Sequence, residues 1–280
     1  MIVKADKNYR RASITKRRGA FIIVALAVLF MSMPKADAHE FWLEPANFAP
    51  ALKTPIPVSI RVGQQFKGDS FPYIGSEFRR FAQVDASGER ALRGTDGDDP
   101  ALTLRFANAG LVALIHESTF EKLNFETWDK FQAYLDLEGL NAIAGKHKAQ
   151  GKPLANIREV YARCAKTLIG VGDAKGVDRL AGMTLEIVAE QNPYLLQRGA
   201  KMRVRLYYLG KPLADTQITA IARADSTQRV NARTDSDGYA MVRLTHSGPW
   251  LLSAVHMIEP NTSEKADWKS YWASLTFAVP

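Results

Sequence analysis

Apolar and polar side chains alternate along the last hundred residues of the chain. This period of two is typical of strands that bury one face, and turn sequences rich in glycine, proline and aspartate separate most of the runs. Seven short strands at this spacing predict an immunoglobulin-like β-sandwich, with no helix of two or more turns inside 200–280. The predicted strands are 184–189, 202–208, 217–223, 229–233, 239–244, 250–258 and 271–279.

The preceding part of the chain mixes two periods. Short apolar or alternating runs predict strands at 57–62, 78–84, 102–106 and 111–115. A helical spacing follows from Trp128 to Leu137, with Gly139 at its end. A second helix is predicted from Asn156, a residue favoured at N-caps, to Gly170, after a polar linker at 146–153.

These patterns predict a mainly β protein with a small helical insertion. We expect a β-rich domain at 39–182, with two helices confined to about 127–170, and a sandwich domain at 183–280. The boundary is placed near Gly182, where the alternating pattern resumes.

The first 38 residues have the pattern of a secretory signal peptide. A basic segment precedes an uncharged stretch of 14 residues at 20–33, and Ala36-Asp37-Ala38 supplies small residues at the −3 and −1 positions of a cleavage site. A membrane-spanning helix needs about 20 apolar residues, so a cleaved signal fits better than an anchor. We therefore expect export to the bacterial periplasm, cleavage after Ala38, and no membrane span in the processed protein.

The net charge and the single cysteine further limit the classes of function that the chain can have. Eight of the 37 basic and two of the 29 acidic residues lie in 1–38, so the formal charge of +8 falls to +2 from residue 39 onward. A nearly neutral body gives no reason to expect nucleic-acid binding. Cys164 is the one cysteine, so no internal disulfide forms, and a small buried thiol is the expected role.

Cleavage after Ala38 makes His39 the first residue of the processed protein. Its free α-amine and its imidazole Nδ1 can chelate one metal ion, and a second histidine nearby would complete a three-nitrogen set suited to copper(II) or nickel(II). Histidine at this position is also compatible with chance, since some residue must follow any export signal.

The remaining histidines are candidates for that second donor. His256 lies late in the predicted strand 250–258, on the same face as its apolar residues, and is the first candidate. His116 follows the strand 111–115 and is held in reserve. His147 falls in the basic linker, where we expect it to be solvated, and His246 falls in a turn-like segment. A histidine on an apolar face is also typical of a hydrogen-bonded core residue.

Several stretches together resemble an uncharacterised family of exported bacterial proteins that has been filed as the periplasmic component of a nickel/cobalt uptake system. The resemblance spans about 39–279 and implies His39 and His256 at matching motif positions, but not His116. The matching stretches are HEFWLEP at 39–45, KFQAYLDLEG at 130–139, REVYARCAK at 158–166, WLLSAVH at 250–256 and WKSYWASLTF at 268–277.

The sequence thus favours a non-enzymatic periplasmic protein that binds nickel, cobalt or copper through His39. Its expected partners are a membrane metal transporter or an outer-membrane receptor. One alternative is a partner-binding β-sandwich without a metal. Another is a histidine-brace copper enzyme, which would use the same amino-terminal histidine.

Overall fold

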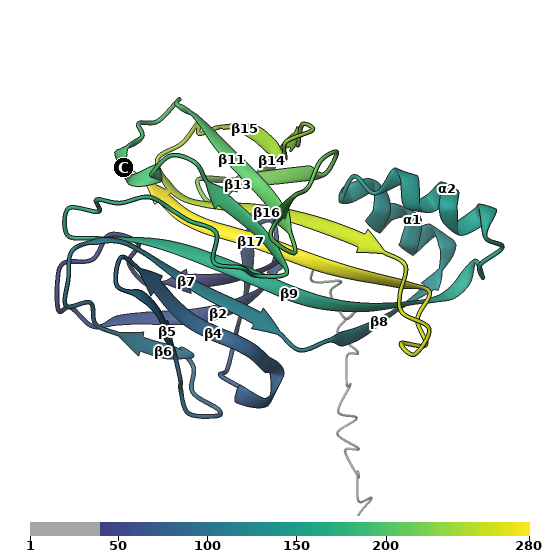
Figure 1. Ribbon diagram of the computed structural model, residues 1–280, viewed down its shortest axis with the longest axis horizontal. Helices are drawn as coiled ribbons and strands as arrows, with labels where there is room; N and C mark the ends of the chain where they lie inside the picture. The colour runs from purple at the N-terminus through teal and green to yellow at the C-terminus, as the bar shows by residue number, and fades with distance from the viewer. Residues whose placement is uncertain (1–39) are drawn as a thin grey trace, which may run out of the picture. The chain divides into compact units, whose positions relative to one another are not determined.

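The computed structural model describes residues 40–280, which contain three β-sheets and two α-helices. The largest sheet has nine strands and runs through the centre (Figure 1). Its strands are all antiparallel except for the pair β17–β9. In spatial order they are β14 (Asp225–Arg233), β13 (Gln217–Ala222), β16 (Gly248–Ile258), β17 (Trp268–Val279), β9 (Ala155–Val171), β7 (Gly110–Ser118), β4 (Phe78–Asp85) and β5 (Gly88–Ala91), with β8 (Glu121–Thr127) also beside β9.

A smaller sheet covers each face of the central one. The first consists of β1 (Glu40–Pro45), β2 (Ile56–Gln64), β3 (Lys67–Phe71) and β6 (Leu102–Leu104). The second consists of β10 (Leu185–Ala189), β11 (Lys201–Tyr208), β12 (Lys211–Pro212) and β15 (Tyr239–Arg243). Two single-turn 3-10 helices, Gly75–Glu77 and Pro193–Leu195, lie in connections.

The two faces of the central sheet bury different partners. We call the face that packs against the second small sheet the sandwich-side face. On it, Leu252 and Ala254 of β16 pack with Leu185 and Val204 of that small sheet. We call the opposite face, which carries Val255, the helix-side face. The first small sheet and the helices α1 (Trp128–Leu137) and α2 (Asn141–Ala149) cover it, the helices near one end of β17 (Figure 1).

The prediction of a mainly β fold with two helices is confirmed. The seven strands predicted from residue 184 onward correspond to β10, β11 and β13–β17, and no helix occurs in residues 200–280. The first, second and fifth of them form one sheet, and the third, fourth, sixth and seventh form the other. This distribution is that of an immunoglobulin-like sandwich, in which the chain passes between the two sheets several times and does not complete one sheet before it starts the other.

The prediction of a second helix from Asn156 to Gly170 is wrong. Residues 155–171 form β9, a strand of 17 residues at the centre of the large sheet, and Asn156 adopts a φ of 54° instead of capping a helix. Both faces of β9 are covered, so Cys164 and Leu168 are buried on one side and Ala165 and Ile169 on the other. A strand buried on both faces loses its alternation, and its apolar residues can match a helical spacing by coincidence.

The prediction of a polar linker at 146–153 is also wrong, because most of this segment belongs to α2 and its final turn. His147 is not solvated but fully buried between α2 and β17. Trp268 Nε1 donates to its Nδ1 at 2.9 Å, and its Nε2 lies 2.9 Å from the carbonyl oxygen of Pro153. Since the indole can only donate, Nδ1 is the acceptor and Nε2 carries the proton.

The first helix lies where its pattern predicts. The Thr127 hydroxyl accepts a hydrogen bond from the Lys130 amide, and Phe131 and Leu135 are buried on the sheet side. Gly139 follows the helix with a φ of 69°, a conformation that glycine adopts without strain.

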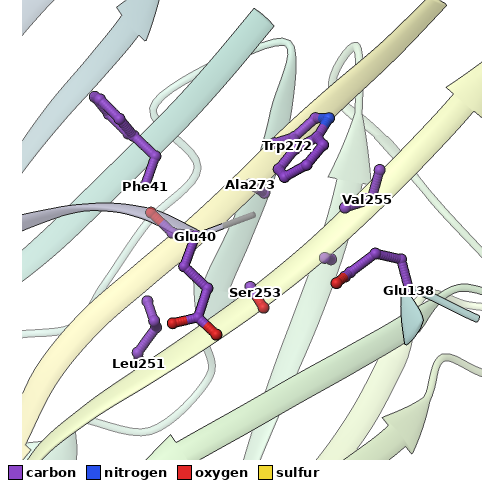
Figure 2. A pocket seen from close by; sticks show the side chains of 10 residues that line it. Glu40, Phe41, Glu138, Leu251, Ser253, Val255, Trp272 and Ala273 are labelled. Atoms are coloured by element: carbon purple, nitrogen blue, oxygen red, sulfur yellow. The ribbon is translucent and has the colours of Figure 1, made fainter. Parts of the chain in front are cut away.

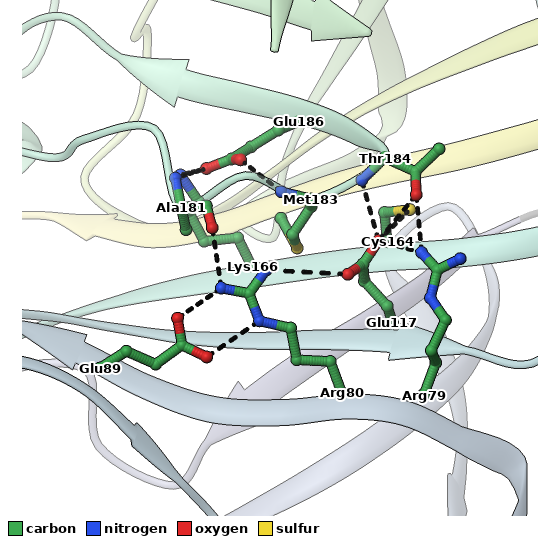
Figure 3. Close-up of polar contacts among 10 residues, drawn as sticks. All are labelled: Arg79, Arg80, Glu89, Glu117, Cys164, Lys166, Ala181, Met183, Thr184 and Glu186. Atoms are coloured by element: carbon green, nitrogen blue, oxygen red, sulfur yellow. Dashed lines mark hydrogen bonds and ion pairs between the residues drawn. The ribbon is translucent and has the colours of Figure 1, made fainter. Parts of the chain in front are cut away.

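Strands from both sides of the expected boundary near Gly182 share the nine-stranded sheet, since β17 pairs with β9. The connecting segment is fastened to that sheet by a buried polar network (Figure 3). Lys166 contacts Glu186, whose carboxylate accepts the amides of Ala181 and Met183. These contacts hold the start of the sandwich on β9.

Candidate functional site

The described chain begins with β1 on the helix-side face, so His39 lies outside the described residues. The ring of Phe41 lies 5.2 Å from the ring of His116, measured between centroids. Trp42 and Leu43 of the same strand are buried. The amino-terminal end of β1 is therefore anchored next to His116.

His116 lies in an aromatic enclosure. Its ring is 1% exposed and lies 4.5 Å from Phe78 and 5.3 Å from Phe81. Among residues 40–280 neither ring nitrogen has a hydrogen-bond partner, which is uncommon for a buried imidazole. Burial and, to a smaller extent, the positive charge of Arg163 lower the pKa of His116 to about 3. The ring is therefore neutral at neutral pH, with a proton on one nitrogen and a free lone pair on the other.

His256 lies on the other face of the central sheet. Its ring is half-buried against Tyr208, at 4.6 Å between centroids, and burial lowers its pKa. Its strand neighbours Val255 and Ser253 point to the helix-side face, where Ser253 lines a pocket with Glu40. The structure thus brings His116, and not His256, to the face on which β1 lies.

Two carboxylates enter a small pocket at the start of β1 from opposite sides (Figure 2). Glu40 accepts the amides of Gln65 at 3.0 Å and Phe66 at 2.6 Å. Glu138, which follows α1, accepts a hydrogen bond of 3.3 Å from Arg229, and the same guanidinium lies 3.7 Å from Glu40.

The buried position of these carboxylates raises their pKa values. Burial raises the pKa of Glu138 to about 6; the charge of Arg229 opposes this shift, and the charge of Glu40 adds to it. Burial also raises the pKa of Glu40. Ser274 lines the same pocket, and its hydroxyl has no hydrogen-bond partner among the residues that the structure describes. Sequence patterns do not indicate this grouping, because its members come from β1, the end of α1, β14 and β17.

Within residues 40–280 no group of three or more histidine, cysteine, aspartate or glutamate side chains is arranged to hold a metal ion. A metal site on the helix-side face would therefore need donors from the start of the processed chain.

Cys164 does not supply a metal donor. It is buried, its thiol points to the Glu117 carboxylate at 3.9 Å, and burial raises its pKa to about 12.

A further buried carboxylate, Glu159 of β9, lies beneath the helices. Its Oε1 accepts hydrogen bonds from Ser270 and, at 3.3 Å, from the Tyr134 hydroxyl, while Oε2 has no hydrogen-bond partner in the described structure, residues 40–280. Burial raises its pKa to about 7, although hydrogen bonds from Ser270, Trp272 and Tyr134 act in the opposite direction. The folded protein therefore binds a proton here that the unfolded chain releases at lower pH.

Glu159→Gln is expected to remove a loss of stability that the parent protein suffers as pH rises. The folded pKa of about 7 exceeds the ordinary value of 4.5, so the free energy of unfolding falls between these two pH values. Since one pKa unit corresponds to about 1.4 kcal/mol and the two values differ by about 2.5 units, the variant should gain roughly 3 kcal/mol on the parent between about pH 4.5 and pH 8. Urea unfolding at several pH values measures this difference.

The exposed residue Glu77 provides a matched control, because Glu77→Gln makes the same chemical change outside the core. Its unfolding curve should follow that of the parent at every pH. A constant difference between Glu159→Gln and the parent across this range would contradict the assignment.

The fold is that of a mainly β protein with an immunoglobulin-like sandwich. Its first described strand, β1, is anchored on the helix-side face of the central sheet. The chain belongs to the family described as "Domain of unknown function (DUF4198)", which matches residues 36–258. A search of curated proteins finds no match. No helix in the described residues is long and apolar enough to cross a bilayer.

Two solved structures match the chain at low identity. The D0-D1 domain of intimin is 14% identical, with 85% of this chain and 97% of that chain covered and a TM-score of 0.21. A Salmonella alpha-2-macroglobulin mutant is 10% identical, with 86% of this chain and 15% of that chain covered and a TM-score of 0.23. At these TM-scores neither structure informs the function.

Proposed function

We propose that this chain is an exported metal-binding protein that serves transition-metal uptake and holds nickel, cobalt or copper at His39 of the processed form. The observation that supports this proposal is the position of His116. A buried imidazole, whose two nitrogens have no partner within the described part of the chain, contacts Phe41, which is two residues from the expected amino terminus.

The reach of the chain is compatible with a shared ion. Two residues of extended chain span about 7 Å, so a residue that precedes Glu40 can approach the ring next to Phe41. His39 would supply its α-amine and Nδ1, and His116 would supply a third nitrogen. His256 is the alternative third donor that the family resemblance implies, and it would require the terminus to reach the sandwich-side face.

Glu40 and Glu138 give this end of β1 a second property. The two buried carboxylates lie with Arg229 on the same face, so this group of three side chains carries a formal charge of −1 when both acids are ionised. Negative charge near the site favours a cation over an anion as the ligand. The proposed partners remain a membrane metal transporter or an outer-membrane receptor, which would receive the ion.

The proposal is tested by metal titration of the exported protein. Intact mass should first establish a start at His39. Isothermal titration with nickel(II), cobalt(II) and copper(II) should then show one tight site for at least one of these ions. The control is the same chain with one glycine before His39, which keeps the imidazole but removes the chelating amine. Its affinity should fall on the order of 100-fold, which corresponds to about 2.7 kcal/mol.

Two results would contradict this function. A processed chain that starts at another residue lacks the chelate, and equal metal affinity with and without the added glycine removes the amine from the site. In either case the immunoglobulin-like sandwich is better interpreted as a partner-binding module without a metal.

A further inference from the structure

The outward face of the second small sheet carries an unusual set of side chains. Along β11 and β15 alternate residues face the core, and the other positions face away from it. We call these outward positions the basic face. They are Lys201, Arg203, Arg205, Tyr207, Tyr239, Met241 and Arg243.

This face concentrates positive charge on a nearly neutral body. Four of its seven positions are basic and none is acidic, whereas residues 39–280 together carry a formal charge of only +2. Arg203 lies 3.8 Å from Glu190 at the margin of the face. Within the described residues Lys201, Arg205 and Arg243 form no ion pair. Their charges are therefore available to a partner.

Aromatic rings hold two of the guanidinium groups in place. Arg203 lies over Tyr239 at 4.8 Å from the ring centroid, and Arg205 lies over the same ring at 4.5 Å and over Tyr207 at 5.2 Å. Arg205 Nε also donates to the carbonyl oxygen of Asp237 at 2.8 Å. A stacked guanidinium keeps N–H groups at its edge, where they can bind a phosphate through two hydrogen bonds.

The spacing suits a planar array of anions. Outward residues on one strand are about 7 Å apart and neighbouring strands about 5 Å apart, so the four cations spread over a surface and do not converge on one point. The pocket at the start of β1 includes none of these residues. Met241 is 49% exposed in register with Arg203, and Tyr207 and Tyr239 have the amphipathic character of residues at lipid–water interfaces.

We propose that the basic face docks the protein on a membrane surface rich in anionic phospholipid. Arg203 and Arg205 bind lipid phosphates, Lys201 and Arg243 add attraction to the headgroup layer, and Met241 contacts the acyl boundary. Figure 1 shows β11 and β15 on the side of the sandwich away from β9 and β7, where such a plane has access to them. This inference does not depend on the metal site.

The test compares binding of three forms of the exported chain to vesicles of phosphatidylglycerol and phosphatidylcholine in equal parts, by cosedimentation. The forms are the parent, a basic-face variant with Arg203→Glu and Arg243→Glu, and a control with Lys67→Glu and Arg93→Glu, two exposed residues of the amino-terminal half. Both double variants lower the net charge by the same amount. All three forms have the same residues before Glu40, so any contribution of that segment cancels.

The basic-face variant should bind at least about tenfold more weakly than the parent, and the control within about twofold of it. Binding of the parent should be lost on vesicles of phosphatidylcholine alone and at about 1 M salt, where charges are screened beyond roughly 3 Å. Thermal unfolding checks that the variants fold. Should the glutamate variant not fold, Arg203→Gln with Arg243→Gln keeps the outward positions polar and should still weaken binding.

Four results would overturn the proposal. Equal losses in the two double variants would show that only net charge matters, and parent-like binding by the basic-face variant would remove this face from the contact. Binding of a polyglutamate peptide more tightly than the vesicles would identify an acidic protein segment as the partner instead. Inorganic phosphate at millimolar concentration should not displace the parent from vesicles, and full displacement would indicate a single-phosphate site.

Discussion

Lys166→Ala is expected to lower the free energy of unfolding by about 3–5 kcal/mol, because it leaves buried charge without a partner. Lys166 is fully buried on β9, with its Nζ 2.6 Å from Glu186 and 3.1 Å from Asp178. Burial alone would lower the pKa of Lys166, but these carboxylates outweigh it and raise the pKa above its ordinary value. The lysine therefore stays charged in the core, and both acids depend on it.

An exposed ion pair in the same region provides the control. Lys175 lies 3.1 Å from Asp173, and its side chain is 80% exposed. Lys175→Ala should therefore change stability by at most about 1 kcal/mol. Urea unfolding followed by tryptophan fluorescence measures both variants. A loss below about 1 kcal/mol for Lys166→Ala would show that the pair of acids is hydrated or protonated without the lysine.

His116→Phe is expected to weaken metal binding on the order of 100-fold while the protein stays folded. Phenylalanine can occupy the enclosure formed by Phe41, Phe78 and Phe81, and the imidazole that it replaces makes no hydrogen bond. The change removes one nitrogen donor and keeps the aromatic packing. Isothermal titration with the metal that binds the parent most tightly measures the loss.

His256→Phe is the matched control on the sandwich-side face, where its ring would still contact Tyr208. Its metal affinity should equal that of the parent. The reverse outcome, a loss with His256→Phe and none with His116→Phe, would assign the third donor to His256, as the family resemblance implies. If His39→Ala also binds normally, the site is not at the amino terminus.

The carboxy-terminal sandwich was predictable because each of its strands buries one face. In β11 and β15 the exposed and buried positions alternate, so the sequence shows both the strands and their inward residues. The buried role of Cys164 was also predictable from its type. The secondary structure around Cys164 was not, since β9 is covered on both faces and its apolar residues no longer alternate.

The candidate site could be predicted only in part. His116 was visible as a histidine at the end of an apolar strand, but its isolation from hydrogen bonds depends on Phe41, Phe78 and Phe81 closing around it. His147 sits between two lysines, and that local charge suggested a solvated residue. Its burial follows from the packing of α2 on Trp268, which lies 121 residues away.

The sequence by itself determined the class of fold, the helix Trp128–Leu137 and the strands of the sandwich, because these depend on the periodicity of neighbouring side chains. Only the tertiary structure decided which histidine lies with β1, and it placed His116 and His256 on opposite faces of one sheet. It also gathered Glu40, Glu138 and Arg229 from three separate elements. Such contacts depend on how sheets stack, and local periodicity carries no information about stacking between distant segments.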